Sequence, residues 1–152
     1  DTRRLPRSNE RPGRASFSAM LFEDDVVAAV VTHLRADGWD IESTALATQH
    51  GDDIVATRNG VRLIVEAKGQ GSSKSHTSRY GKPFNRGQAS THVGVAVLRS
   101  LRVVSEGSSI AGIALPSDEF HRREVDRVHS ALSKLGIQVY WVNELREVSV
   151  QE

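Results

Sequence analysis

The sequence predicts an α/β protein in which a mixed central sheet is flanked by helices. Apolar residues recur at helical spacing in three separate stretches. An Asn-Gly pair between two β-branched runs predicts a β-hairpin, and further short apolar runs predict three more strands. These segments follow one another along the 152 residues in the order α-β-β-β-α-β-α-β, which favours helices on both faces of the sheet.

The first helix is expected over about residues 18–36, and Gly38 follows its end. A first strand is expected next, over 39–48. The helix carries an apolar stripe that is typical of packing against a sheet. The stripe consists of Val27, Val30, Val31 and Leu34.

The next two strands form a hairpin around Asn59 and Gly60, because a type I′ turn requires positive φ at both central residues. With these two residues as the loop, the register places Asp53 directly opposite Glu66. Side chains alternate between the two faces of a strand, so Lys68 is expected on the face of these carboxylates and Asp52 on the other. Apolar residues occur on both faces of the hairpin, which favours a place inside a covered sheet.

Four further elements complete the predicted fold. They are a second helix over 83–105, a fourth strand over 110–115, a third helix from Ser117 or Asp118 to about 135, and a fifth strand over 137–142. Gly136 is typical of the end of a helix. The predicted buried face of the second helix consists of Ala89, Val93, Ala96, Val97 and Leu101.

The chain is expected to form a single domain over 18–152, preceded by a basic arm over 1–17. The arm contains five arginines and few apolar residues, which is typical of a flexible segment that contacts nucleic acid or serves as a linker. No apolar stretch is long enough to span a membrane and no signal peptide is visible. A cytoplasmic protein without membrane contact is therefore expected.

The composition excludes several classes of function. The chain has no cysteine, which excludes disulfides, thiolate metal sites and cysteine nucleophiles. No P-loop, GxGxxG or Gly-x-Ser-x-Gly element is present, so nucleotide hydrolysis, dinucleotide chemistry and serine hydrolysis lack support. The six histidines show no zinc-ligand spacing.

Asp53, Glu66 and Lys68 are the main candidate catalytic residues. Two like charges that face each other across a β-ladder are destabilising unless a positive group lies between them. A divalent cation together with the Lys68 ammonium would supply that positive charge. A Glu-x-Lys pair on a strand is by itself usually a solvated charge pair, and the register-matched Asp53 is what favours a metal site.

Glu23 is a candidate for the same site, because helical spacing places it on the core-facing side of the first helix. Its carboxylate would point toward the hairpin and bind a metal ion or the water shell of that ion. The alternative is an acid of the first helical turn that the helix dipole stabilises, since Glu23, Asp24 and Asp25 are consecutive.

No acid occurs between Ala67 and Ser105, and this basic stretch is a candidate for contacts with phosphates. Its first part, 69–81, is rich in Gly and Ser, which is typical of a loop that contacts phosphates and equally of a solvated flexible loop. The candidate DNA-binding residues are Lys74, Arg79, Tyr80, Lys82, Arg86 and His92.

The order of elements and one residue pattern resemble the PD-(D/E)XK nuclease superfamily and its restriction-endonuclease-like fold over about residues 20–142. The pattern consists of Glu23, Asp53, Glu66-Ala67-Lys68 and Gln88. The chain is similar to stand-alone restriction-type and Holliday-junction-resolvase-type members, with an αβββαβ core and an additional C-terminal αβ. In the exonuclease-like branch, Gln is followed four residues later by Tyr, whereas here His92 follows Gln88.

The resemblance implies a Mg²⁺- or Mn²⁺-dependent endonuclease that hydrolyses phosphodiester bonds in double-stranded or branched DNA. The implied metal ligands are Asp53, Glu66, the backbone carbonyl of Ala67, and Glu23. Lys68 would position the attacking water or neutralise developing charge, and Gln88 would orient Lys68 or a phosphate unless it is an ordinary exposed helix residue. Two alternatives stay open: a catalytically silent DNA-binding module of the same fold, and a nuclease that needs a second copy or a partner recognition subunit.

Overall fold

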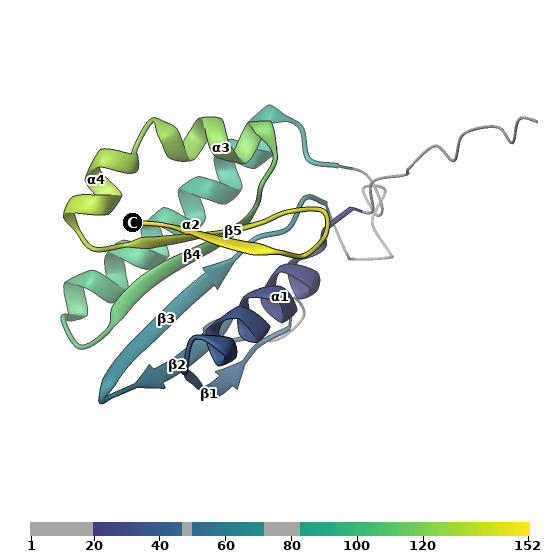
Figure 1. Ribbon diagram of the computed structural model, residues 1–152. Helices are drawn as coiled ribbons and strands as arrows, with labels where there is room; N and C mark the ends of the chain where they lie inside the picture. Colours follow the sequence, from purple (N-terminus) through teal and green to yellow (C-terminus); the bar gives the residue numbers. More distant parts are fainter. Residues whose placement is uncertain (1–19, 47–49, 72–82) are drawn as a thin grey trace, which may run out of the picture.

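The computed structural model describes residues 20–46, 50–71 and 83–152, so the predicted arm over 1–17 lies outside the described residues. The described chain has a mixed sheet flanked by helices, which confirms the predicted α/β class (Figure 1). Its elements are α1 (Glu23–Ala36), β1 (Asp40–Thr44), β2 (Ile54–Arg58), β3 (Val61–Ala67), α2 (Arg86–Glu106), β4 (Ile110–Pro116), α3 (Glu119–Asp126), α4 (His129–Lys134), β5 (Gln138–Val142) and β6 (Val148–Gln151).

The six strands form one sheet whose spatial order equals the chain order, β1-β2-β3-β4-β5-β6. β1, β2 and β3 are antiparallel, β3, β4 and β5 are parallel, and β6 returns antiparallel to β5. The predicted hairpin is confirmed, because Asn59 and Gly60 have φ of 52° and 77° and Ile54 pairs with Val65. The same register brings Asp53 beside Glu66.

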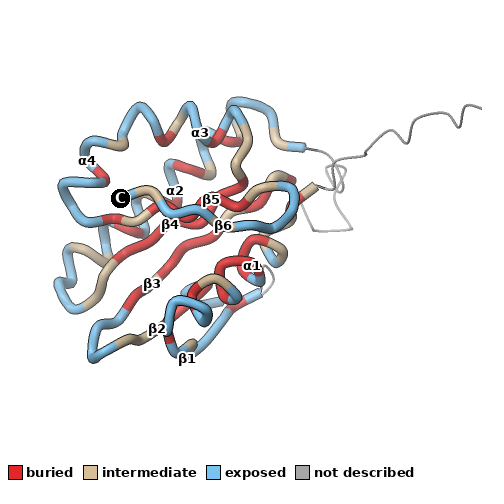
Figure 2. The backbone as a smooth tube through the Cα atoms, viewed as in Figure 1, coloured by how far each residue is buried: buried red, intermediate tan, exposed pale blue. Residues whose placement is uncertain are grey.

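Helices cover both faces of the sheet and define two apolar cores (Figure 2). α1 packs on one face, where Val26, Val30 and Leu34 meet Leu63 and Val65 of β3. α2 packs on the other face together with α3 and α4, and these helices bury β4 and β5 from that side. The central strands are therefore covered on both faces, which explains why the hairpin carries apolar residues on each side.

Several predicted boundaries were wrong. α1 begins at Glu23, not near 18, and β1 ends at Thr44. The predicted third helix is two short helices that are separated near Val128. The charged segment has too few apolar residues to specify one long helix, and the break between its two parts lets Leu132 reach the core on the α2 side.

β6 was not predicted, because four residues on a sheet edge give too short a pattern to identify a strand. On α2, Ala89, Val93 and Ala96 are buried as predicted, whereas Leu101 is exposed and Ser100 is buried in its place. Among the described residues, no helix has the length and apolar character needed to cross a membrane.

Candidate metal and phosphate site

Asp53 and Glu66 lie side by side where β2 begins and β3 ends, on the face of the sheet that α2 covers. Both residues are only 6% exposed, although each carries a carboxylate. Burying a charge is costly unless a partner offsets it, so this pair needs positive groups nearby. Two basic side chains supply them in the structure.

Glu66 binds one basic side chain through each carboxylate oxygen. Its Oε1 accepts a hydrogen bond from Lys68 Nζ at 2.6 Å, and its Oε2 accepts one from Arg99 Nη1 at 2.9 Å. The first contact confirms that Lys68 shares the face of Glu66, as the alternation of side chains along the strand predicted. The second contact arrives from α2 and was not predicted.

Asp53 has a different environment, because its nearest polar partner is a backbone group. Its Oδ2 accepts a hydrogen bond from the backbone N–H of Ala67 at 2.7 Å. Burial, followed by the negative charges of Glu66 and Glu23, raises the pKa of the Asp53 carboxyl to about 7 against the opposing effect of that hydrogen bond. With Asp53, Glu66 and Glu23 all ionised, the site would carry more negative charge than its two basic residues neutralise.

Glu23 stands at the first position of α1, and a close backbone approach brings it to the site. A Cβ atom at Gly69 would lie 2.5 Å from the backbone nitrogen of Glu23, so only glycine allows this contact. Burial raises the pKa of Glu23, and the charge of Lys68 opposes that shift while Glu66 adds to it. The charges of Lys68 and Glu66 thus both act on Glu23, as expected from its predicted place on the inner side of α1.

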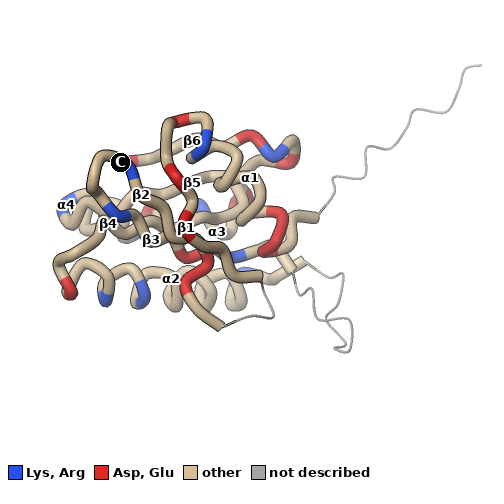
Figure 3. The backbone as a smooth tube through the Cα atoms, turned by 90° about the horizontal axis from the view of Figure 1, so that it is seen from below, with Lys and Arg blue, Asp and Glu red and all other residues tan. Residues whose placement is uncertain are grey.

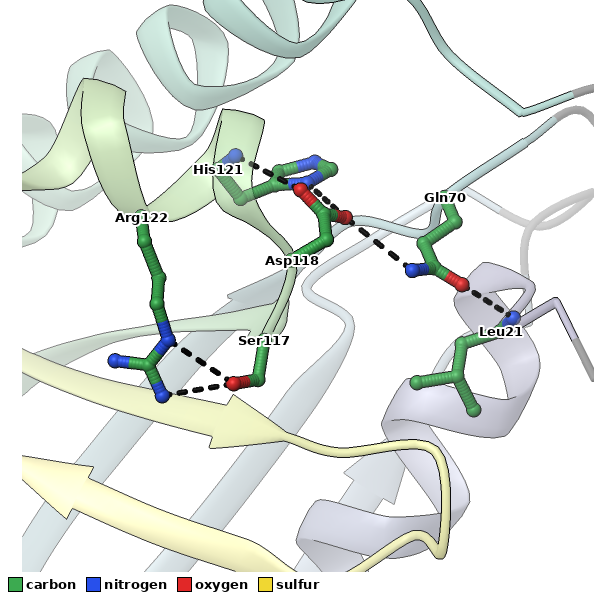
Figure 4. Close-up of polar contacts among 6 residues, drawn as sticks. All are labelled: Leu21, Gln70, Ser117, Asp118, His121 and Arg122. Carbon is green, nitrogen blue, oxygen red and sulfur yellow. Dashed lines mark hydrogen bonds and ion pairs between the residues drawn. The ribbon is translucent and has the colours of Figure 1, made fainter. Parts of the chain in front are cut away.

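Gln70, which follows β3, is hydrogen-bonded to the segment that leads into α1 (Figure 4). Its backbone N–H donates to the carbonyl of Leu21 at 2.7 Å, and its side-chain oxygen accepts from the Leu21 N–H at 2.9 Å. The side-chain amide donates to Asp118 Oδ2 at 3.3 Å. Gln70 therefore connects the end of β3, the start of α1 and the N-cap of α3.

Asp118 in turn binds the buried ring of His121 through Nδ1 at 2.7 Å. Burial would raise the pKa of Asp118, but the hydrogen bonds from the ring and backbone of His121 outweigh it and lower the pKa. The carboxylate of Asp118 is thus held in its charged form as a structural anchor for Gln70.

Arg99 and Gln70 were missed by the sequence analysis. Gln70 continues the alternation from Glu66 through Lys68, and that spacing was the available signal. Ser100 lies on the buried stripe of α2, and Arg99 directly precedes it. The Arg99 side chain therefore starts at the edge of the helix face that meets the sheet. Its contact with Glu66 depends on how α2 lies across the sheet, which helical spacing does not define.

The face predicted for Asp52 was wrong. It was expected on the face opposite Glu66, yet it lines the same cavity as Glu66 and Arg99. β2 begins only at Ile54, and Gly51 has φ of 127°, so the residues before Asp53 are not regular strand and the period of two does not extend to them.

The remaining predicted site residues lie apart from the carboxylates or outside the described chain. Gln88 caps α2: its Oε1 accepts from the Asn85 N–H at 3.0 Å, and no described hydrogen bond joins it to Lys68. His92 stacks on Phe84 at 4.3 Å between ring centroids. Burial, then the charges of Lys68 and His121, lowers the pKa of His92. Arg86 is exposed at the start of α2, and the predicted contacts of Lys74, Arg79, Tyr80 and Lys82 fall within 72–82, outside the described residues.

The donor set suits a hard divalent cation, which commonly uses one or two protein carboxylates and completes its shell with water. Asp53 and Glu66 supply oxygen ligands, and their excess negative charge is the property that such a cation would offset. In the arrangement seen here, no group of three or more His, Asp or Glu among the described residues is close enough to hold a metal ion. Both oxygens of Glu66 also bind basic side chains, so a cation at Glu66 would compete with Lys68 and Arg99.

No protein-family model, curated protein or solved structure matches this chain. The chemistry of the site must therefore be argued from its own residues. Those residues are two buried carboxylates on neighbouring strands, a third acid at a helix start, and two basic side chains that bind one of the carboxylates.

Proposed function

We propose that this protein is a Mg²⁺- or Mn²⁺-dependent endonuclease that hydrolyses phosphodiester bonds in DNA, with a restriction-endonuclease-like core. The observation that carries the proposal is the buried pair of Asp53 and Glu66, with Lys68 donating to Glu66 from the same strand face. The resemblance of this residue pattern to PD-(D/E)XK nucleases supports the same activity.

A purely structural role explains the pair poorly. Two buried carboxylates on neighbouring strands repel each other, and replacing them with apolar residues would stabilise most sheets. Burial, with a smaller effect of the Glu66 charge, raises the pKa of Asp53. Carboxyl groups with a shifted pKa are typical of functional sites. In such a site a bound cation or a positive group of the substrate offsets the negative charge of the carboxylates.

Asp53 and Glu66 would hold the cation, with the Ala67 carbonyl as a further ligand. When bound, a divalent cation generates a nucleophilic water at neutral pH and offsets charge on the phosphate. Lys68 would donate to the attacking water or to the phosphate from its place beside Glu66. Glu23 would accept hydrogen bonds from the metal's water shell, which its position at the start of α1 permits.

DNA is the proposed substrate because α2, the helix that packs beside the carboxylates, carries basic side chains. Arg86, Arg99 and Arg102 lie along α2, where the only acid is Glu106, and Figure 3 shows the basic positions on this helix. Phosphate contacts by such residues position a nucleic acid without reading its sequence. Residues 72–82, where further DNA contacts were predicted, lie outside the described residues, and Gly71 and Pro83 on either side of them form an antiparallel bridge.

The test is a cleavage assay with Mg²⁺ or Mn²⁺ on supercoiled, linear, single-stranded and four-way-junction DNA. Wild-type protein is compared with Glu66→Gln and with an EDTA control. Metal-dependent cutting that is lost in the variant would establish the nuclease, and the preferred DNA would indicate a restriction-type or a junction-resolving enzyme. Absence of cutting on every substrate would overturn the proposal for the protein acting alone.

One observation favours a second candidate, a catalytically silent DNA-binding module. Both oxygens of Glu66 are bound by basic side chains, as expected if the carboxylate has only a structural role. Metal titration separates the two: a silent module binds DNA with an affinity that Mg²⁺ does not change. A nuclease that needs a second copy or a recognition subunit would instead bind Mg²⁺ and cut only when that partner is added.

A further inference from the structure

Arg99 occupies a carboxylate oxygen that a metal ion would need. Its guanidinium binds Glu66 Oε2 at 2.9 Å, while half of its side chain, 51%, stays exposed to solvent. Both partners are charged, so this is a charge-assisted hydrogen bond. Glu66 itself is buried, whereas the Arg99 side chain borders solvent.

A cavity of about 380 Å³ opens beside this ion pair, between α2 and the sheet. Arg99 and Arg102 line it about one helical turn apart, so both side chains border the same space. Ser100 also lines it, and the Ser100 hydroxyl is buried without a hydrogen-bond partner in the part of the chain that the structure describes. Buried hydroxyls are normally paired, so Ser100 has unused hydrogen-bonding capacity at the wall of this cavity.

The wall of this cavity carries ligands for an anion together with groups that repel one. Two guanidiniums and a hydroxyl are typical phosphate ligands, and the planar fork of arginine matches phosphate oxygens. The same wall carries three carboxylates, from Asp52, Glu66 and Glu106. These carboxylates repel a phosphate until a divalent cation offsets their charge.

We propose that Arg99 exchanges partners: it neutralises Glu66 in the metal-free protein, and it binds a DNA backbone phosphate with Arg102 and Ser100 once a divalent cation has replaced it at Glu66. This inference rests on the proposed nuclease function. The exchange couples the two ligands, because the cation frees the guanidinium that the phosphate needs. By linkage, DNA must then increase the affinity for the cation by the same factor.

The first arm of the test measures Mn²⁺ affinity without DNA by isothermal titration calorimetry. Arg99→Met removes the competitor from Glu66 and is expected to bind Mn²⁺ about 10-fold more tightly than wild type. Arg102→Met is expected to leave Mn²⁺ affinity unchanged, because Arg102 has no described contact with Glu66. Arg35→Met is the matched control, since Arg35 lies on α1 across the sheet.

The second arm measures binding of a duplex oligonucleotide with Ca²⁺ in place of Mg²⁺. Arg99→Met and Arg102→Met are each expected to weaken binding about 10-fold or more, and wild-type binding is expected to weaken when EDTA is added. The Arg35→Met control should bind as wild type does. Arg99→Lys keeps a positive charge and is expected to give intermediate values in both arms.

Two results would overturn the inference alone. They are wild-type protein that cuts DNA while Arg99→Met binds Mn²⁺ no more tightly, and DNA binding that Arg99→Met leaves unchanged. A wild-type protein that neither binds Mn²⁺ nor cuts DNA would overturn the inference together with the proposed function. Circular dichroism of each variant confirms that the fold is retained.

Discussion

Gly69 and Glu23 are in backbone contact, and this contact brings the first helix to the carboxylates. A Cβ atom at Gly69 would come within 2.5 Å of the Glu23 nitrogen and 2.8 Å of the Phe22 carbonyl carbon. Both neighbours are backbone atoms, so neither is able to turn aside. The glycine that follows Lys68 therefore decides whether Glu23 reaches the site.

Gly69→Ala is expected to destabilise the protein by about 1–3 kcal/mol, because the added methyl group displaces the start of α1. Urea denaturation measures the change in the free energy of unfolding. Gly94→Ala is the matched control: nothing lies within 4 Å of its Cβ position in α2, so this variant should gain up to about 1 kcal/mol from helix propensity. Equal stability of the two variants would contradict the close approach.

Glu66→Gln and Asp53→Asn are each expected to lower cleavage by more than about 100-fold, because each removes a metal ligand while keeping the shape of the side chain. Initial rates on the preferred DNA at saturating Mg²⁺ measure this loss. Glu42→Gln is the control, since Glu42 pairs on the sheet surface with Arg62 at 3.5 Å. If neither Glu66→Gln nor Asp53→Asn slows cleavage more than Glu42→Gln does, the pair has no part in the reaction.

The raised pKa of Asp53 predicts how the stability of the metal-free protein depends on pH. Its pKa is raised from 3.8 to about 7, so between these values the folded state holds a proton that the unfolded state has released. Stability in EDTA should therefore fall as pH rises from about 4 to 7. Asp53→Asn cannot titrate and still offers an oxygen to Ala67, so it should be more stable than wild type at pH 8 by roughly 1–3 kcal/mol.

The comparison between these proteins is made by thermal unfolding in EDTA at pH 5 and pH 8. Asp52→Asn controls for the loss of a carboxylate from the same loop, because Asp52 is exposed. A stability difference between Asp53→Asn and wild type that does not grow with pH would show that Asp53 is ionised throughout this range.

Gln70→Ala is expected to lower stability by about 1–2 kcal/mol, because it leaves the Leu21 N–H without its partner and removes the amide from Asp118. It should also weaken Mn²⁺ binding, because the start of α1 with Glu23 is then less firmly placed. Gln88→Ala is the matched control: it loses a helix cap at similar cost in stability and should keep Mn²⁺ affinity. Equal metal affinity in both variants would show that Gln70 has no influence on the site.

The local part of the site was predictable from the sequence. Asn59-Gly60 determines one hairpin register, that register pairs Asp53 with Glu66, and strand alternation adds Lys68. Each step uses a rule that acts over a few residues. Where the regular strand ended the rule failed, and Asp52 was assigned to the wrong face.

The sequence by itself determined the α/β class, the hairpin and most of each apolar face, because hydrogen-bond geometry and side-chain period act locally along the chain. Only the tertiary structure decided that Arg99 binds Glu66, that Gln70 joins Leu21 to Asp118, and that the charged segment after β4 forms two helices. These contacts join residues that are far apart in sequence. They depend on the position of α1 and α2 across the sheet, which the combined packing of both cores sets and no local pattern encodes.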